Sequence, residues 1–279
     1  MNSVLVTGSS GFIGKKIIEK LPKSIVILDT INSKRIDLRN INDVLKIDSV
    51  DTVIHLGGKT PSEKLKSKDY FENNVFGTLN ILEYCILKKV KKLIYVSSYV
   101  YGNPKNIPIN ENHSVSPHNA YTESKFYGEQ LCKLYCDKSD LKVTILRPFN
   151  IFGKSMNDNF LLTNLINATK TDEKITIVNR NSKRDFLYID DFIDLILKVK
   201  DYNSKFEIFN VGAGVSFSFD EIIKIIEKIT SKKLNLEYLI DEKILIKDIR
   251  ADISKVKKQL DWEPKIKFEN FLKKIFSIS

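Results

Sequence analysis

Near its amino terminus the chain reads Val4-Leu5-Val6-Thr7-Gly8-Ser9-Ser10-Gly11-Phe12-Ile13-Gly14, an apolar run followed by three glycines and then by the helix-like segment 15–21. A strand that feeds a glycine-rich turn and opens a helix points backbone N–H groups and the positive end of the helix dipole at an anion. Gly8 permits a tight turn, Gly11 lets the backbone approach a phosphate, and Gly14 lets the helix pack close to its strand. The stretch therefore predicts a site for the pyrophosphate of a dinucleotide.

A second apolar run, residues 25–28, ends in Asp29. That separation from the glycines suits an acidic residue that accepts hydrogen bonds from the adenosine ribose. An acid there also repels a 2′-phosphate, so the sequence favours NAD(H) over NADP(H). Two alternatives stay open: Asp29 is an ordinary turn residue at a strand end, or Arg35, close by in sequence, admits NADP(H).

Composition argues against several classes of protein. The 279 residues are 42% hydrophobic and 29% charged, as in folded globular proteins. No apolar stretch approaches the ~20 residues needed to span a bilayer, and no leader precedes the first strand, so we expect a cytoplasmic protein without membrane contact. Cys85, Cys132 and Cys136 form no C-x-x-C pair and the histidines are scattered, so no metal site is expected. The net charge of +10 comes from dispersed lysines, which argues against nucleic acid as a partner.

Strand-like and helix-like segments alternate through the first half of the chain, the pattern of a doubly wound parallel sheet. We therefore predict a Rossmann-type α/β fold. The expected strands are residues 4–6, 25–28, 52–56, 92–97 and 142–146, and the expected helices are 15–21, 41–47, 70–88 and 121–139. The alternation ends near Gly153, which predicts a cofactor domain at 1–152 that segment 188–211 rejoins. A smaller, discontinuous substrate-binding region is expected at 153–187 and 212–279.

Tyr121 and Lys125 stand four residues apart in a predicted helix, so their side chains share one face. A lysine at that distance lowers the pKa of a phenol and can also hydrogen-bond a cofactor ribose. Ser97 and Ser98 stand at the carboxyl end of a predicted strand, the edge at which ligands bind in open α/β sheets. Together these residues predict a site that exchanges a proton with a substrate hydroxyl.

The chain as a whole resembles the extended short-chain dehydrogenase/reductases, a family of nucleotide-sugar epimerases, dehydratases and reductases. The resemblance covers nearly the whole chain and rests on an ordered series of motifs. They are the T-G-x-x-G-x-x-G turn, Asp37-Leu38, His55-Leu56-Gly57-Gly58, Asn74-Val75-Phe76-Gly77-Thr78, Ser97-Ser98-Tyr99-Val100-Tyr101-Gly102, Tyr121-Thr122-Glu123-Ser124-Lys125, Arg147-Pro148-Phe149-Asn150, Arg184-Asp185-Phe186, Asn210-Val211-Gly212 and Ala251-Asp252-Ile253-Ser254-Lys255.

The resemblance implies roles for individual residues. Tyr121 would be the acid/base and Lys125 its activator and ribose ligand. Ser97 would orient the reacting hydroxyl because it stands four residues before Tyr101, as the family's serine or threonine usually does; a gap placed otherwise selects Ser98. The implied cofactor contacts are Gly8, Ser10, Gly11, Phe12, Ile13, Gly14, Asp29, Asp37, Leu38, Leu56, Gly57, Lys59, Asn74, Lys125, Pro148 and Phe149. The implied substrate contacts are Ser98, Tyr99, Asn150, Arg184 and Arg250.

Some of these residues have plainer interpretations. Asn74 could only orient the active-site helix, His55 could be a packing residue, and Arg184 could be an ion-pair partner of Asp185. The stretch 241–250 departs from the family's usual arginine motif for the substrate diphosphate, which leaves Lys243, Lys247 or Arg250 for that role.

The sequence also bears on the reaction. Dehydratases of this family carry an Asp-Glu pair directly after the catalytic threonine, and Ser98 and Tyr99 occupy those positions here, which disfavours dehydration. The short chain and its serine loop resemble bacterial reductases, so we predict NAD(P)-dependent reduction of a dTDP- or GDP-4-keto-6-deoxyhexose in surface-polysaccharide synthesis. The alternative is an NAD-dependent UDP-sugar 4-epimerase, and a remote one is a non-catalytic NAD-binding regulator. In the resembling family the helices equivalent to 70–88 and 121–139 often form a homodimer interface, and we expect one here.

Overall fold

The computed structural model describes residues 3–31, 34–154, 156, 160–241 and 246–277 and places them in two units. The first unit comprises Met1–Gly102, Ser114–Pro148 and Ile193–Phe209, and the second comprises Asn103–His113, Phe149–Phe192 and Asn210–Ser279. The segment that rejoins the first unit, Ile193–Phe209, falls inside the predicted segment 188–211. Segment 103–113 differs from the predicted boundaries. It joins the second unit because Ile109 N donates to the Arg250 carbonyl and the Ile109 carbonyl accepts from Asp252 N, each at 2.8 Å.

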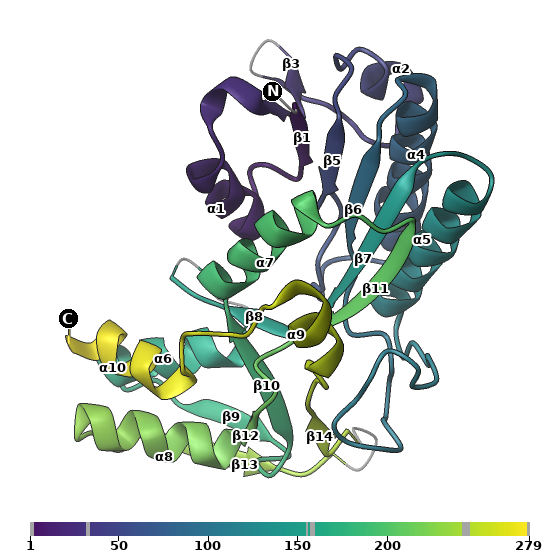
Figure 1. The fold of residues 1–279 in the computed structure, drawn as a ribbon. Coiled ribbons are helices and arrows are strands. Elements are labelled where there is room, and N and C mark those ends of the chain that lie inside the picture. The colour runs from purple at the N-terminus through teal and green to yellow at the C-terminus, as the bar shows by residue number, and fades with distance from the viewer. Residues whose placement is uncertain (1–2, 32–33, 155, 157–159, 242–245, 278–279) are drawn as a thin grey trace. The chain divides into compact units, whose positions relative to one another are not determined.

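A six-stranded sheet runs through the first unit in the order β11-β7-β6-β5-β1-β2 (Figure 1). Its strands are β1 (Val4–Thr7), β2 (Val26–Leu28), β5 (Thr52–His55), β6 (Lys92–Val96), β7 (Lys142–Pro148) and β11 (Phe206–Val211). β1 pairs in parallel with β2 on one side and with β5 on the other, so the strand order reverses between β1 and β5. Ligands bind at the carboxyl ends of the strands beside such a switch point. The predicted Rossmann-type parallel sheet is confirmed.

Helices α4 and α5 lie side by side over one face of this sheet (Figure 1). The helices and short elements of the first unit are α1 (Phe12–Lys20), η1 (Lys23–Ile25), β3 (Thr30–Ile31), β4 (Lys34–Arg35), α2 (Ile41–Val44), α3 (Ser67–Tyr70), η2 (Phe71–Phe76), α4 (Gly77–Leu87) and α5 (Ala120–Asp137). The predicted helix 70–88 contains a π-helical turn, η2, and the predicted helix 41–47 is shorter. Apolar residues of α4 and α5, Ile81, Leu82, Cys132 and Cys136 among them, bury against Val53, Leu93 and Val143 of the strands.

The second unit has a smaller sheet in the order β12-β10-β14, with β8 also pairing with β10, and a two-stranded sheet of β13 and β9. Its elements are β8 (Asn150–Phe152), α6 (Leu161–Thr171), β9 (Ile175–Val178), β10 (Lys183–Tyr188), β12 (Ser216–Ser218), α8 (Phe219–Thr230), β13 (Leu236–Leu239), β14 (Asp248–Ile249), α9 (Ser254–Leu260) and α10 (Phe268–Ser277), and α7 (Ile189–Asp201) leads back to the first unit. Its core gathers around the Phe152 ring, which meets Phe268 and Phe271 edge-on.

The three cysteines are free thiols, all buried. Within the described ranges, no three or more His, Cys, Asp and Glu side chains come together as a group that could hold a metal ion. None of the helices in the described part of the chain is long and apolar enough to cross a membrane.

Candidate active site

The glycine-rich turn between β1 and α1 has geometry that requires glycine. Gly8 has a φ of +69°, and a Cβ there would lie 2.9 Å from the backbone N of Gly57. A Cβ on Gly14 would lie 2.3 Å from the Gly8 carbonyl oxygen, so Gly14 allows α1 to pack against the turn. After Gly11, α1 starts with no side-chain cap and no acidic residue in its first turn, which suits an anion at its positive end. This cradle fits a pyrophosphate, and it includes the other predicted contacts Ser10, Phe12 and Ile13.

Asp29 follows β2 and ties the glycine-rich turn to that strand. Its side chain is only 1% exposed. The carboxylate accepts hydrogen bonds from Gly8 N at 2.8 Å, from Ser9 Oγ at 2.5 Å and from Ser9 N at 3.4 Å. Asp29 therefore fixes the turn, a role that its position in the sequence did not indicate. The ribose contact stays a prediction, and the side chain of Arg35 lies outside the described part of the structure.

The strand ends beside the turn are packed closely as well. A Cβ on Gly57 would lie 2.4 Å from Leu38 Cδ1, and Gly57 N donates to Thr7 Oγ1 at 3.0 Å. Leu56 N donates to the Thr7 carbonyl at 3.3 Å. Three predicted cofactor contacts, Leu38, Leu56 and Gly57, thus lie together at the carboxyl end of β1 and β5.

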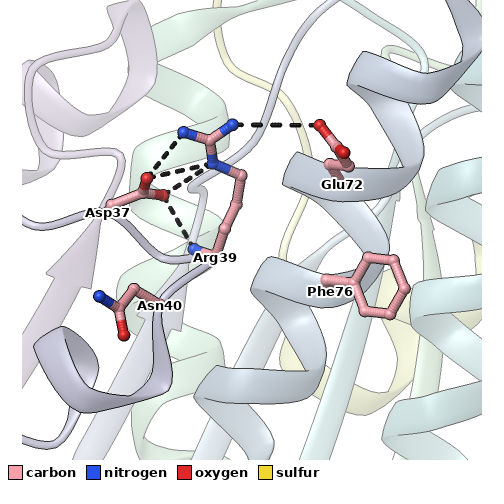
Figure 2. A pocket seen from close by; sticks show the side chains of 5 residues that line it. All are labelled: Asp37, Arg39, Asn40, Glu72 and Phe76. Atoms are coloured by element: carbon pink, nitrogen blue, oxygen red, sulfur yellow. Dashed lines mark hydrogen bonds and ion pairs between the residues drawn. The ribbon is translucent and has the colours of Figure 1, made fainter.

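A pocket of about 420 Å³ opens beside Leu38 and is lined by Asp37, Arg39, Asn40, Glu72 and Phe76 (Figure 2). The Arg39 guanidinium donates to both oxygens of Asp37, with Nη2 to Oδ2 at 2.7 Å, and its Nη1 lies 4.0 Å from Glu72. The hydrogen bond from Arg39 lowers the pKa of Asp37. Asp37, one of the implied cofactor contacts, is thus an anion hydrogen-bonded by Arg39 at the wall of a pocket large enough for a purine ring.

Tyr121 lies in the first turn of α5, and the start of that helix is firmly capped. Asn119 Oδ1 accepts from Thr122 N at 2.9 Å, and Thr122 Oγ1 accepts from Asn119 N at 3.2 Å. The Tyr121 ring meets Tyr70 edge-on with centroids 5.9 Å apart. Burial raises the pKa of the Tyr121 phenol, while a hydrogen bond with the Ser98 side chain lowers it. The Tyr121 phenol can therefore exchange a proton, and the Ser98 hydroxyl lies beside it.

Of the two serines, Ser98 rather than Ser97 interacts with the Tyr121 phenol. Ser97, expected beside Tyr121, instead donates from Oγ to Glu129 Oε1 at 2.5 Å and is 3% exposed. Ser98, expected as a substrate contact, is the serine whose side chain hydrogen-bonds the Tyr121 phenol. Tyr121 and Glu129 stand about two turns apart on α5, so the two serines meet different parts of the same helix. The serine beside Tyr121 therefore stands three residues before Tyr101, whereas the resemblance implied a serine four residues before it.

Lys125 lies one turn further along α5, with its side chain 6% exposed. Its Nζ lies 4.6 Å from the centre of the Tyr95 ring. Burial lowers the pKa of Lys125 to about 8, although Cys132 and Glu129 act in the opposite direction. The ammonium form therefore persists at neutral pH close to the site, as its predicted role requires.

His55 at the end of β5 is a structural residue. Its Nδ1 lies 2.6 Å from Thr7 Oγ1 and its Nε2 lies 3.0 Å from Thr78 Oγ1. Burial, with a smaller effect of Lys125, lowers the pKa of His55 to about 3. The neutral ring therefore joins β1, β5 and α4, in agreement with the packing interpretation.

The π-helical turn η2 joins the loop after β5 to the catalytic helix. Asn74 Oδ1 accepts from Lys59 N at 2.7 Å, and its Nδ2 donates to the Lys59 carbonyl at 3.1 Å and to Ser124 Oγ at 2.9 Å. Tyr70, just before η2, bonds both the N and the carbonyl of Ser62 through its hydroxyl. These contacts favour an orienting role for Asn74 over direct cofactor contact. The sequence analysis did not single out Tyr70 as a site residue. Its position four residues before Asn74, one helical turn away, could have indicated that the two side chains share a face.

The remaining predicted contacts lie near the unit boundary or in the second unit. Tyr99 turns into its own loop, where its hydroxyl donates to the Gly102 carbonyl at 2.6 Å. Pro148 ends β7, and Phe149 N donates to the Val211 carbonyl at 2.9 Å. Both side chains are buried.

The substrate-side candidates of the second unit gather around β10. Asn150 Nδ2 donates to the Asp185 carbonyl at 2.9 Å. The carboxylate of Asp185 accepts from the backbone N of Ala213 at 2.6 Å and of Ala251 at 3.1 Å. Asp185 thus holds two backbone segments together. Because adjacent residues of a strand point to opposite faces of the sheet, the side chain of Arg184 points away from that carboxylate.

Two arginines of this unit were predicted to hold the substrate phosphates. Arg184 Nη1 donates to the Lys183 carbonyl at 2.9 Å, and its guanidinium lies over Phe219. The Nε of Arg250 is buried, and no hydrogen-bond partner stands beside it among the described residues. An unpaired buried donor is costly, and this Nε is covered by the protein itself. Lys243 lies outside the described residues.

Comparison with known proteins agrees with this arrangement. The model of the NAD dependent epimerase/dehydratase family matches residues 4–212. A UDP-glucuronate 4-epimerase of Thermodesulfobacterium geofontis is 30% identical, with 98% of this chain and 95% of that protein covered. A putative UDP-glucose 4-epimerase of Methanocaldococcus jannaschii is 29% identical, with 98% and 96% covered.

Solved structures agree in the same way. A UDP-glucuronic acid 4-epimerase from Bacillus cereus, in complex with UDP-glucuronic acid and NAD, matches with a TM-score of 0.88 at 26% identity, covering 99% of this chain and 98% of that one. Since the family model spans most of the chain and a relative at 30% identity spans nearly all of it, this protein belongs to the NAD dependent epimerase/dehydratase family.

Proposed function

We propose that this protein is an NAD-dependent 4-epimerase of UDP-sugars. The acid/base part of the proposal rests on the interaction of Ser98 with the Tyr121 phenol, with Lys125 one turn along the same helix, and the choice of an epimerase rests on the relatives. The relatives and the solved structure described above carry the names of UDP-sugar 4-epimerases. Their names favour the epimerase over the 4-keto-6-deoxyhexose reductase that the sequence led us to predict.

The first unit offers a fitting place for NAD. The pyrophosphate would lie against the glycine-rich turn at the start of α1, the ribose near Asp29, and the adenine near the pocket wall formed by Asp37. When bound, NAD supplies an acceptor that takes a hydride from a sugar carbon and gives it back. An epimerase retains its cofactor through the cycle, so the purified protein should carry bound NAD.

Tyr121 would move the proton of the sugar hydroxyl. Burial disfavours the phenolate of Tyr121, and the buried ammonium of Lys125 offsets that penalty because opposite charges stabilise each other in a low-dielectric site. Ser98, already bonded to the phenol, would hold the reacting oxygen beside it. These three side chains would remove the hydroxyl proton as the carbon is oxidised and return it after reduction.

The second unit would hold the nucleotide end of the substrate. Arg184 and Arg250 each carry a guanidinium fork suited to phosphate oxygens. By strand register Arg184 of β10 pairs with Ile249 of β14, and Arg250 follows directly after that strand. We assign both to the diphosphate and Asn150 to the sugar side.

The alternative is the NAD(P)H-dependent 4-ketoreductase. One relative, a GDP-6-deoxy-D-talose 4-dehydrogenase of Aggregatibacter actinomycetemcomitans, favours it at 28% identity over 84% of this chain. Two measurements separate the reactions: the nucleotide released when the purified protein is denatured, and the products from UDP-glucose or UDP-glucuronate without added cofactor. Bound NAD and a C4 epimer support our proposal. A cofactor-free protein that oxidises added NAD(P)H with a 4-keto-6-deoxy nucleotide sugar contradicts it.

We also propose that the protein is a homodimer joined through α4 and α5. Three large apolar side chains of this helix pair are exposed: Leu87 (61%), Tyr127 (49%) and Leu134 (44%). Exposed apolar side chains gathered on one helix pair are typical of an interface, and two copies would bury them against each other.

A further inference from the structure

Beneath the catalytic side chains lies a buried polar cluster that the proposed mechanism does not use. Glu129 of α5 and Arg147 of β7 form an ion pair with Arg147 Nη2 to Glu129 Oε2 at 2.6 Å and Nε to Oε1 at 3.0 Å. Ser97 Oγ donates to the same Oε1 at 2.5 Å, and Arg147 Nη1 donates to Tyr101 Oη at 2.8 Å. Glu129, Arg147 and Ser97 are 2%, 4% and 3% exposed.

A buried ion pair is a poor device for stability alone, because desolvation of two charges offsets most of their attraction. Unlike an apolar contact, this ion pair connects three elements through directed hydrogen bonds. Glu129 belongs to the catalytic helix, Arg147 to β7, and Ser97 to the end of β6. Ser97 N also donates to the Leu146 carbonyl at 2.8 Å. Both the backbone and the side chain of Ser97 are therefore fixed.

The anchored residue stands directly beside a catalytic one. Ser97 directly precedes Ser98 in the chain, so the contacts that fix the backbone and side chain of Ser97 restrain the position from which the Ser98 side chain projects. Ser98 is the serine that acts on the Tyr121 phenol. The orientation of Ser98 thus depends on what holds Ser97.

Glu129 also lies one helical turn beyond Lys125, on the same face of α5. The groups that face Lys125 are the Tyr95 ring from β6, the neutral His55 from β5, and Cys132 and Glu129 from α5 itself. Burial raises the pKa of Cys132, which keeps that thiol neutral. Of these groups, Glu129 is the carboxylate, and it forms the ion pair with Arg147.

We propose that Glu129, held by Arg147 and Ser97, is a positioning residue of the active site, which aligns the Lys125 turn of α5 with the strand end that presents Ser98. Its carboxylate acts through Ser97 on the direction of the Ser98 hydroxyl and through space on the Lys125 ammonium. The inference rests on the proposed function, since it assigns a role within that same site.

The positioning part is tested by Ser97→Ala with Ser97→Thr as the matched control, because threonine keeps the hydroxyl. We expect Ser97→Ala to lower kcat about 10-fold, the effect of losing one directed hydrogen bond, with KM and bound NAD unchanged. Ser97→Thr should restore most of kcat. Wild-type kcat in Ser97→Ala, or equal loss in both variants, would overturn the positioning role.

The charge part needs a variant that folds, and Glu129→Gln alone would leave Arg147 as an uncompensated buried cation. The double variant Glu129→Gln/Arg147→Met removes both charges and keeps an amide oxygen for Ser97. We expect the alkaline limb of its kcat–pH profile, set by loss of the Lys125 proton, to move to lower pH than in the wild type. An unmoved limb would overturn the effect of Glu129 on Lys125.

A titration without substrate separates this inference from the proposed function. The phenolate absorbance of each protein minus that of its Tyr121→Phe counterpart reports the ionisation of Tyr121. Ser97→Ala and the double variant should both ionise at higher pH than the wild type. If the wild type epimerises no nucleotide sugar and the shifts still appear, the proposed function fails and the positioning role stands. If turnover is present and neither kcat nor the titration moves, the positioning role fails.

Discussion

At the scale of single residues, Tyr121→Phe removes one hydroxyl and keeps the ring that packs edge-on against Tyr70. We expect kcat to fall roughly 10²–10⁴-fold, the scale of general acid–base catalysis, while bound NAD stays at the wild-type level. Steady-state kinetics and nucleotide analysis on the same preparation measure both. Turnover close to that of the wild type would remove Tyr121 from the acid/base role.

Asp29 combines two roles that separate variants can distinguish. Asp29→Asn keeps an oxygen for Gly8 N and removes the charge, whereas Asp29→Ala also removes the link to the turn. We expect Asn to relax discrimination against NADPH by roughly 10-fold, the equivalent of one charge interaction of ~1.4 kcal/mol. Ala should weaken binding of both cofactors. Cofactor titrations check this, and an unchanged preference in Asp29→Asn would place the discrimination elsewhere.

The two serines mark the limit of what the sequence could predict about individual residues. The glycines, Tyr121 and Lys125 have fixed spacings within one turn or one helix, so their positions follow from local geometry. Ser97 and Ser98 lie where β6 runs into a loop, and a one-residue difference in loop length exchanges which of them meets Tyr121. The partner that settles the choice, Glu129, lies 32 residues away from Ser97, and no local pattern points to it.

At the scale of elements, His55 connects β1, β5 and α4 in its neutral form, which gives the fold a dependence on pH. The folded protein holds the pKa of His55 at about 3, against 6.5 for an ordinary histidine, so the unfolded chain binds the extra proton between these values. The free energy of unfolding should therefore fall as pH drops below about 6.5, by at most about 1.4 kcal/mol per pH unit from this group.

The variant His55→Gln keeps two polar atoms for Thr7 and Thr78 and cannot titrate in this range. Chemical denaturation of both proteins at a series of pH values should show a flatter dependence in the variant. Parallel curves for the two proteins would show that the loss of stability in acid comes from other groups.

The elements that the sequence predicted best are those with a clear period. The strands of the parallel sheet are continuous apolar runs, and α5 has both a cap and a helical stripe, so their existence followed from the residues alone. The π turn η2 did not, because Tyr70 and Asn74 reach side-chain partners in the loop after β5 and in α5 that only the folded chain brings near. The elements of the second unit are short and joined by loops, and their pairing depends on residues distant in sequence.

At the scale of the whole molecule, the proposed dimer makes a prediction about mass. Sedimentation at micromolar concentration should show twice the 32.1 kDa of one chain. Leu87→Glu/Leu134→Glu places charges on two exposed apolar positions of α4 and α5 and should shift the protein toward the monomer, because burial of an unpaired charge at an interface is costly. A wild-type protein that sediments only as a monomer would contradict the proposal.

The reaction itself was the least predictable property from the sequence, because epimerases and reductases of this family share the cofactor site and the acid/base residues. The difference depends on how the sugar lies over the cofactor and whether the cofactor leaves. Both properties belong to the complete assembly rather than to a motif.

The most direct test of the account follows the hydrogen at C4. UDP-glucose or UDP-glucuronate labelled with deuterium at C4 is incubated with the purified enzyme without added cofactor, and nuclear magnetic resonance follows the product. We predict that the C4 epimer accumulates to equilibrium with the deuterium still at C4, because the hydride is taken and returned within one active site. No epimer from either UDP-sugar, together with consumption of added NAD(P)H on a 4-keto-6-deoxy nucleotide sugar, would contradict it.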